Sequence, residues 1–546
     1  MNTAWTKTLL AGLRGAGADI AVASPGSRST PLLCAARDVG IPIHVAIDER
    51  TAAFFAVGRA KVTGRPALLL CTSGSAATHY HPAIVEAALS YVPVVAVTAD
   101  RPPELAACGA AQTIDQTRLF GEFARAFFDL GLPDDTPDAM AGVARKASQA
   151  VAVSLGPVPG PVHINVPARK PLEPQPDPAN AGLPAGIRST RHFAPVSIAS
   201  DDGVAALVQV CRRSERGLVV CGPAPVSAVA ARDAVAELAA RTGFPMWCEA
   251  ASQMRFRGRA TPPLCCDALD HVADELAPAD VIVELWGPPT SAAYHQYLAR
   301  NPAAQRWVVT PHGWRDPHNT AHGIIHGDIA EAARRIAAGM TPRAATDWTA
   351  SVCELNRRGQ AIGETDADAE SRLVRAAVAA IPAGGLVALG NSKPIRTVDR
   401  FVAARAVDAA VWSQRGANGI DGLISGGAGA ASAGDRPVLL VVGDVSAAHD
   451  IGGLALARRA TCPLAIVVVD NGGGRIFEQL PIAAAESIAP DFSRLWLTPP
   501  GIDFAAAAAT YGVDYAATSN YGELTTAVRA ALGRPGCTLI RAEVAA

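Results

Sequence analysis

Short runs of apolar, mostly β-branched residues recur along this chain and alternate with stretches of helical periodicity. Two clear runs are residues 438–443 (VLLVVG) and 465–469 (AIVVV). Strands that are buried on both faces have this composition, and helices then cover both faces of a parallel sheet. The alternation predicts an α/β fold of doubly wound domains with mostly parallel sheets.

The strand-like runs fall into three blocks. A chain of 546 residues is too long for a single core, so we expect one domain per block. The segment between the first two blocks is rich in proline and has no periodicity, which is typical of a linker. The predicted organisation is a first α/β domain at 1–175, a Pro-rich linker at 176–198, a central α/β domain at 199–345 and a third α/β domain at 346–546.

The composition excludes several classes of protein. Hydrophobic residues make up 49% and charged residues 18%, which suits large cores. The formal net charge of −2 predicts neither a nucleic-acid partner nor stable association with a membrane surface. No apolar run approaches the roughly 18 residues of a spanning helix. The 11 cysteines are an odd number without a CxxC pair, so we expect a reduced, cytoplasmic protein.

Two oxygen-bearing side chains follow neighbouring strands in the third block. Asp444 ends one apolar run and Asn471 ends the next, and residues 445–470 are enough for one crossover helix and one strand. Magnesium prefers carboxylate and carbonyl oxygens together with phosphate oxygens and water. Asp444, Asn471 and the backbone carbonyl of Gly473 therefore form a candidate metal site, although two unrelated turns would give the same spacing.

Other polar residues lie at predicted strand ends. Glu49 opens a strand-to-helix turn, where it is either a helix start or a carboxylate that faces a heterocycle. Arginines suited to binding carboxylates follow four strands, although each alone is more often part of an ion pair. They are Arg28, Arg101, Arg396 and Arg415.

Several strings in the two outer domains resemble one family closely. They include SPGSRSTPL, IDER, TSGSAA, TADRPPEL, QTIDQ, GPVHINVP, RGANGIDG, GDVSAAHD and NGGGRIF. The family is that of the 2-succinyl-5-enolpyruvyl-6-hydroxy-3-cyclohexene-1-carboxylate synthases, which are thiamine diphosphate-dependent transferases of menaquinone biosynthesis. The resemblance implies pyrimidine-binding, central and diphosphate-binding domains in a homodimer or dimer of dimers. The implied substrates are 2-oxoglutarate, which is decarboxylated, and isochorismate, to which the remaining four-carbon unit is added.

The resemblance also implies roles for individual residues. Glu49 would act on the aminopyrimidine of the cofactor, and Ile420 would support the bent cofactor. The implied metal ligands for Mg²⁺ or Mn²⁺ are Asp444, Asn471 and Gly473. The implied cofactor-binding residues are Glu49, Thr72, Ser73, Gly74, Gly390, Ile420, Gly443, Asp444, Val445, Ser446, Asn471 and Ile476. The implied substrate-binding residues are Ser27, Arg28, Arg101, Gln112, Ser392, Arg396, Arg415, Ile476 and Phe477.

The sequence departs from the family pattern at two places and leaves alternatives open. Ala111 stands where many members have asparagine, and Arg475 stands where smaller or neutral residues are also familiar. Arg315 is a weak candidate for a basic substrate contact from the central domain. Another thiamine diphosphate enzyme, such as a 2-oxo acid decarboxylase, would keep Glu49 and Asp444 without needing the arginines. A non-catalytic ligand sensor would not require Glu49.

Overall fold

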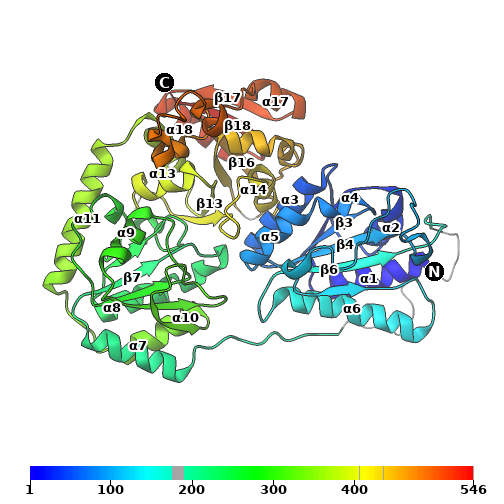
Figure 1. Cartoon of the computed structure of the whole chain (residues 1–546), viewed down its shortest axis with the longest axis horizontal. Coiled ribbons are helices and arrows are strands. Elements are labelled where there is room, and N and C mark those ends of the chain that lie inside the picture. Colours follow the sequence, from blue (N-terminus) through cyan, green and yellow to red (C-terminus); the bar gives the residue numbers. More distant parts are fainter. Residues whose placement is uncertain (175–189, 405, 435, 545–546) are drawn as a thin grey trace. The chain divides into compact units, whose positions relative to one another are not determined.

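The computed structural model describes residues 1–174, 190–404, 406–434 and 436–544. Residues 176–189 of the predicted linker lie outside the described residues. Three six-stranded sheets make up the chain, and all of their strand pairs are parallel (Figure 1). The predicted fold class is confirmed.

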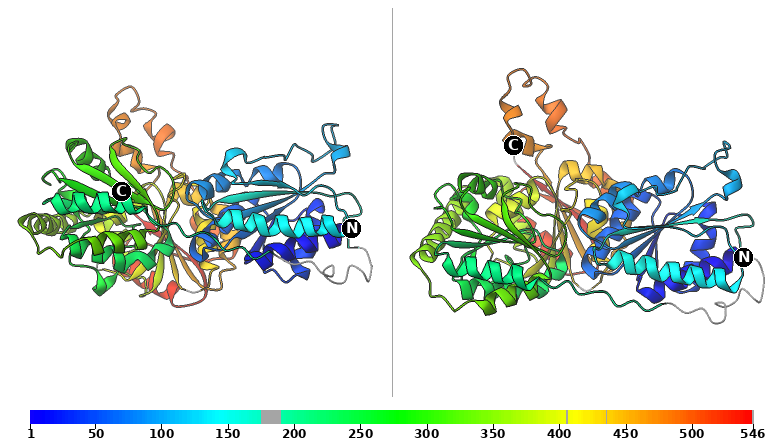
Figure 2. Two further views of the ribbon diagram at one scale, coloured as in Figure 1. Left: turned by 90° about the horizontal axis from the view of Figure 1, so that it is seen from below. Right: turned by 60° about the horizontal axis from the view of Figure 1, so that its bottom comes forward.

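The first sheet has the strand order β2-β1-β3-β4-β6-β5. Its strands are β1 (Ile20–Ala23), β2 (Ile43–Val45), β3 (Ala67–Cys71), β4 (Val94–Asp100), β5 (Phe127–Asp129) and β6 (Pro161–Pro167). Its helices are α1 (Asn2–Ala16), α2 (Thr30–Asp38), α3 (Glu49–Thr63), α4 (Ser75–Thr78), α5 (His81–Leu89) and α6 (Pro137–Leu155). Figure 2 shows α6 alongside α1, where a Cβ added at Gly12 would lie 2.7 Å from the Cβ of Ala147.

The second sheet has the order β12-β11-β10-β7-β8-β9. Its strands are β7 (Gly217–Cys221), β8 (Met246–Cys248), β9 (Cys265–Cys266), β10 (Val281–Leu285), β11 (Gln305–Thr310) and β12 (Ala321–His326). The helices of this region are α7 (Asp201–Arg213), α8 (Arg232–Thr242), α9 (Ala292–Arg300), α10 (Ile329–Gly339) and α11 (Asp347–Thr365).

The third sheet has the order β14-β13-β15-β16-β18-β17, which is the strand order of the first sheet. Its strands are β13 (Gly385–Leu389), β14 (Ala409–Ser413), β15 (Val438–Gly443), β16 (Pro463–Asp470), β17 (Asp514–Thr518) and β18 (Gly536–Glu543). The helices are α12 (Ala369–Val378), α13 (Lys393–Phe401), α14 (Leu423–Ala431), α15 (Asp444–His449), α16 (Leu454–Ala457), α17 (Phe504–Tyr511) and α18 (Tyr521–Leu532).

The chain packs as two compact units. One unit comprises Met1–Pro195, Gln414–Gly434 and His449–Thr461, and the other comprises Val196–Ser413, Asp435–Ala448 and Cys462–Ala546. The first unit therefore holds the first sheet together with α14 and α16, while the second unit holds the second and third sheets.

Within the first unit, α3 and α14 lie side by side at very close range (Figure 1). A Cβ added at Gly58 would lie 1.9 Å from the carbonyl oxygen of Gly426, and one added at Gly429 would lie 2.0 Å from that of Phe55. The small residues of α14 (LISGGAGAA) allow this approach, because larger side chains would push the two backbones apart.

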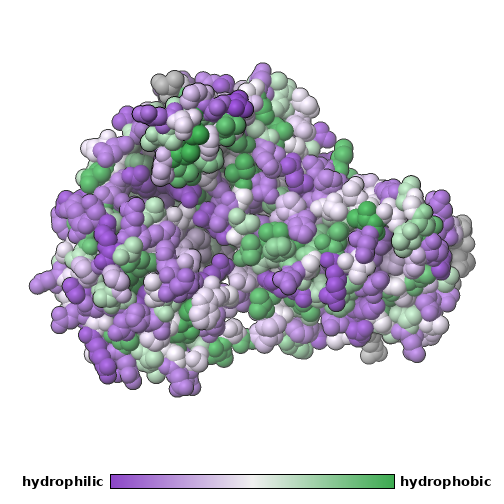
Figure 3. All heavy atoms as spheres, in the orientation of Figure 1, coloured by the Kyte–Doolittle hydropathy of each residue, from purple (hydrophilic) through white to green (hydrophobic). Residues whose placement is uncertain are grey.

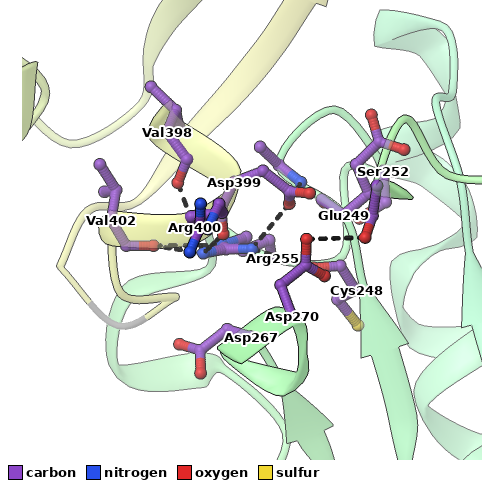
Figure 4. Close-up of polar contacts among 12 residues, drawn as sticks. Cys248, Glu249, Ser252, Arg255, Asp267, Asp270, Val398, Asp399, Arg400 and Val402 are labelled. Carbon is purple, nitrogen blue, oxygen red and sulfur yellow. Dashed lines mark hydrogen bonds and ion pairs between the residues drawn. The ribbon is translucent and has the colours of Figure 1, made fainter. Parts of the chain in front are cut away.

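Within the second unit, a buried ion pair joins the loop after β8 to α13 (Figure 4). Arg255 Nη1 lies 2.9 Å from Asp399 Oδ1, and the two residues are 2% and 6% exposed. Arg255 Nη2 also donates to the carbonyl of Val402 at 2.6 Å, at the C-terminal end of α13. A charged donor there satisfies carbonyls that the helix leaves unpaired.

The face of the molecule in Figure 3 is largely hydrophilic, with apolar side chains in scattered patches. Among the described residues, no helix combines the length and the apolar character needed to cross a membrane. All eleven cysteines are free thiols, and seven of them are buried.

Candidate active site

The predicted site residues of the first sheet follow the strands at its topological switch point. In this strand order the connections reverse between β1 and β3, and the carboxyl ends there are the usual place for a ligand. The turn with Ser27 follows β1, and Thr72 follows β3. The two turns touch, because a Cβ added at Gly26 would lie 2.6 Å from the Cβ of Thr72.

A second loop closes against the turn after β3. Ser73 Oγ donates to the carbonyl oxygen of Gln112 at 3.0 Å, and Gln112 Nε2 donates back to the carbonyl of Ser73 at 3.2 Å. The backbone N–H of Gly74 donates to Gln116 Oε1 at 3.0 Å, and Gly74 has a φ of +87°, which favours glycine. The structure thus brings together Ser73, Gly74 and Gln112.

Two of the predicted arginines flank this cluster. Arg28 is 5% exposed and donates from Nη1 to the carbonyl of Ala168 at 2.7 Å. Arg101 donates from Nη2 to the backbone carbonyl of Ala111 at 3.0 Å. Ala111, which stands where many family members have asparagine, therefore contacts Arg101 through its backbone. The Nε atoms of both arginines are buried without an acceptor among the described residues. Burial and the neighbouring Arg101 lower the pKa of Arg28, and a carboxylate ligand would offset both effects.

Glu49 is the first residue of α3, and its side chain is half-buried. Asp48 caps this helix by accepting from the N–H groups of Arg50 and Thr51 at 2.8 and 3.4 Å. Because Asp48 provides the cap, Glu49 has no capping role. Burial and, to a smaller extent, the charge of Glu49 raise the pKa of Cys71 in β3.

The loop that carries Arg415 and Ile420 is held by α5. Glu86 is 3% exposed; its Oε1 accepts from Gly416 N–H at 3.2 Å and its Oε2 accepts from Ala417 N–H at 2.7 Å. Lys61 Nζ lies 2.6 Å from Glu86 Oε1 and compensates the buried charge. These two hydrogen bonds to Glu86 fix the backbone beside Arg415 within the first compact unit.

The candidate metal ligands lie at the carboxyl ends of the neighbouring strands β15 and β16, in the second unit. Asp444 follows β15 and is 1% exposed, and its Oδ2 accepts from the N–H of Gly473 at 2.7 Å. Asn471 follows β16, and its Oδ1 is buried without a donor among the described residues. Burial is the largest effect on Asp444 and raises the pKa of its carboxyl.

This arrangement fits a divalent cation. An unpaired amide oxygen, a buried carboxylate and the carbonyl of Gly473 are three oxygen donors of the type that Mg²⁺ and Mn²⁺ accept. The described residues contain no group of three or more His, Cys, Asp or Glu side chains that could hold a metal. A metal at Asp444 would therefore complete its coordination with water and with phosphate oxygens of a ligand.

The remaining predicted positions of the third sheet surround this point. Gly390 follows β13 and donates from its N–H to Val441 O at 2.8 Å. Ser392 has a φ of +71° at the start of α13, and its carbonyl accepts from Arg396 Nη1 at 2.8 Å. Burial lowers the pKa of Arg396. The other predicted positions lie in the first turn of α15 or just before it: Gly443, Val445 and Ser446.

The glycine-rich loop after Asn471 folds against residues 493–497. Gly473 has a φ of +126°, and a Cβ there would lie 2.3 Å from Leu497 O. Arg475 turns back onto its own loop, donating from Nε to the carbonyl of Asn471 at 2.6 Å. Ile476 and Phe477 are both half-buried on the following turn.

Some polar residues of these sites were missed by the sequence analysis. Gln116, Glu86 and Glu370 each contact a predicted site residue or the loop that carries one. Their partners are 42, 331 and 101 residues away in the sequence, so no local motif marks them. The signal in the sequence was weak: Glu86 is a lone charged residue within an otherwise apolar helix, HPAIVEAAL. Arg315 lies between β11 and β12 and packs 3.7 Å from a Cβ added at Gly287.

Comparisons with known proteins agree with this arrangement. The model of the N-terminal domain of thiamine pyrophosphate enzymes, which binds the cofactor, matches residues 4–119, and the model of the C-terminal domain matches residues 403–542. A solved structure assigned to a thiamin diphosphate-dependent enzyme from Mycobacterium smegmatis superposes with a TM-score of 0.73 at 19% identity, covering 97% of each chain. At that identity the likeness concerns the fold.

Full-length relatives are more specific. A 2-succinyl-5-enolpyruvyl-6-hydroxy-3-cyclohexene-1-carboxylate synthase from Sorangium cellulosum is 43% identical, covering 100% of this chain and 93% of the relative. Synthases of the same name from Halobacterium salinarum and Bacillus velezensis are 38% and 35% identical over 99% and 96% of this chain, and over 95% and 92% of their own lengths. With both cofactor-binding domains present, this chain belongs to the thiamine diphosphate-dependent 2-succinyl-5-enolpyruvyl-6-hydroxy-3-cyclohexene-1-carboxylate synthase family.

Proposed function

We propose that this chain decarboxylates 2-oxoglutarate and adds the remaining four-carbon unit to isochorismate, as a transferase of menaquinone biosynthesis. The observation that carries the proposal is full-length similarity to synthases of that name, at 43% identity for the relative from Sorangium cellulosum. The arginines support it. Arg28 and Arg101 keep buried Nε–H groups without acceptors among the described residues, and both proposed substrates carry carboxylates.

Bound thiamine diphosphate would supply the electron sink for decarboxylation. Glu49 would hold a proton on a ring nitrogen of the aminopyrimidine, a role for which its half-buried position suits it. Asp444, Asn471 Oδ1 and the carbonyl of Gly473 would hold Mg²⁺ or Mn²⁺ at the diphosphate. Ile420 would support the cofactor, and Thr72, Ser73, Gly74 and Gly390 would line its site.

The substrate would be held by polar side chains from several strand ends. Arginines would pair with its carboxylates, and Ile476 and Phe477 would exclude water from the reacting atoms. The polar residues proposed for this task are Ser27, Arg28, Arg101, Gln112, Ser392, Arg396 and Arg415.

We also propose a homodimer or dimer of dimers. Ile47 is 95% exposed and lies two residues before Glu49. A lone exposed isoleucine is common on protein surfaces, so the proposal rests on the resemblance to the synthase family, which implies this assembly. The proposed compartment is the cytoplasm, where buried cysteines can serve as small core residues.

Product analysis tests the activity directly. Purified protein is incubated with thiamine diphosphate, Mg²⁺ and 2-oxoglutarate, with and without isochorismate, and the products are identified by mass spectrometry. We expect a succinylated cyclohexene product only when both substrates are present. Release of carbon dioxide at the same rate without isochorismate, and no such product with it, would instead indicate a 2-oxo acid decarboxylase.

The Glu49→Gln substitution tests the proposed proton-holding group. We expect turnover to fall by roughly 10²- to 10⁴-fold, while the dissociation constant of thiamine diphosphate changes by less than about tenfold. Steady-state kinetics and calorimetric titration of the cofactor measure the two quantities. Unchanged turnover would exclude this role for Glu49.

A further inference from the structure

The side-chain amide of Asn471 is held from behind by a residue on another helix. Glu370, on the first turn of α12, accepts from Asn471 Nδ2 through its Oε2 at 2.9 Å. The same oxygen lies 2.6 Å from Lys393 Nζ. Glu370 is only 4% exposed, so both contacts are made in a buried environment, where charge-assisted hydrogen bonds are strong.

The orientation of this amide decides whether it can bind a cation. An amide group has one end that accepts and one that donates, and only the oxygen can coordinate a metal. With its NH₂ group bound to Glu370, Asn471 turns its Oδ1 away from Glu370. That oxygen is buried and has no donor among the described residues. Asp444 is also held in place, because its Oδ2 accepts a hydrogen bond from the N–H of Gly473 at 2.7 Å.

We propose that Glu370 is a positioning residue of the metal site. It fixes the Asn471 amide with the oxygen toward the cation, and Lys393 anchors the Glu370 carboxylate in place. This inference rests on the metal site of the proposed function and adds to it a residue that touches neither metal nor cofactor. Groups that orient metal ligands in this way commonly contribute 10- to 100-fold to metal affinity.

A purely structural role for Glu370 is separable from this one. The end of α12 is already capped by Asp368, whose Oδ1 accepts from the N–H of Ser371 at 2.7 Å. Asp368 is exposed, and in the described part of the chain no hydrogen bond or ion pair joins it to Asn471. Asp368→Asn is therefore a matched control that perturbs the same helix end and leaves the amide of Asn471 held.

The test measures metal affinity and does not depend on turnover. Mn²⁺ is titrated into the full-length protein with thiamine diphosphate present, and free Mn²⁺ is followed by electron paramagnetic resonance. We expect Glu370→Ala to weaken Mn²⁺ binding by roughly 10- to 100-fold and Asp368→Asn to leave it within about twofold. Thermal unfolding of each variant verifies that it is folded.

A reciprocal exchange gives a second measurement, which holds even if Glu370→Ala does not fold. Asn471→Asp alone places a second carboxylate next to that of Glu370. The repulsion between the two should weaken Mn²⁺ binding. Adding Glu370→Gln restores a donor opposite the new carboxylate, so the double variant should bind Mn²⁺ more tightly than Asn471→Asp alone. A purely structural Glu370 would give no such rescue.

The Mn²⁺ affinities of these variants distinguish the positioning role of Glu370 from the metal site itself. If Asp444→Ala loses Mn²⁺ affinity while Glu370→Ala keeps it, or if the reciprocal exchange gives no rescue, Glu370 is not a positioning residue and the metal site stands. If Asp444→Ala also binds Mn²⁺ normally, the metal assignment itself is wrong.

Discussion

At the scale of single residues, the first compact unit contains a carboxyl group that burial makes costly to ionise. Asp450 is fully buried; its Oδ2 accepts from Ser425 N–H at 2.7 Å and its Oδ1 from Ser425 Oγ at 3.0 Å. Burial raises the pKa of Asp450 to about 6 from an ordinary value of 3.8. Since the folded state binds the proton more tightly, the contribution of Asp450 to stability is greatest below pH 4 and is lost as the pH rises through 6.

This carboxyl gives a pH-dependent prediction. Asp450→Asn keeps an acceptor for Ser425 but removes the titration. The difference in unfolding free energy between variant and parent should therefore move in favour of the variant by about 2 kcal/mol between pH 4 and pH 7. Thermal unfolding across that range measures it, with the exposed helix cap Asp328→Asn as control. A difference that does not change with pH would contradict the assignment to Asp450.

At the scale of elements, the close approach of α3 and α14 leaves no room for one added carbon. Gly58→Ala would place a methyl group 1.9 Å from the carbonyl of Gly426. We expect the variant to lose about 1–3 kcal/mol because the helices must separate. Gly142→Ala, on α6, is the control: a Cβ there meets nothing within 4 Å, so the change should be neutral or gain up to about 1 kcal/mol. Equal unfolding temperatures for the two variants would show that the contact is not tight.

Element by element, the sequence predicts the long apolar strands better than the short or polar ones. β15 and β16 are apolar, β-branched and buried on both faces, so composition alone identifies them. β5 and β17 were not predicted because both are edge strands with few buried residues, and their composition differs little from that of loops. β9 has only two residues, too few for any periodicity.

The candidate active site is likewise predictable only where local sequence marks its residues. Arg28, Asp444 and Asn471 could be predicted because each lies just after the carboxyl end of a parallel strand, and that position can be read from local sequence. Glu86 and Glu370 could not, because their importance arises from hydrogen bonds to backbone or side chains far along the chain. In a helix, a lone glutamate is most often a solvated residue.

At the scale of the whole molecule, the Arg255–Asp399 pair contributes to holding the second compact unit together (Figure 4). Arg255→Met leaves the Asp399 carboxylate buried without its partner, so we expect a loss of about 3–5 kcal/mol. Arg358→Ala breaks a surface pair with Glu275 at 2.9 Å, in which the side chains are 50% and 46% exposed, and should cost less than about 1 kcal/mol. The two variants are compared by thermal unfolding and by the rate at which limited proteolysis cuts within residues 196–413. Similar losses would mean that the buried pair has no special role.

The shared strand order of the first and third sheets means that one architecture occurs twice in this chain. The two copies carry their acids at different places: Glu49 lies four residues after β2, where the same position after β14 holds Ala417, and Asp444 directly follows β15, where Thr72 directly follows β3. Duplication of a single ancestral domain, followed by division of labour, would leave this pattern. Selection acting on the strand ends of each copy then places different side chains there, while the scaffold beneath them stays the same.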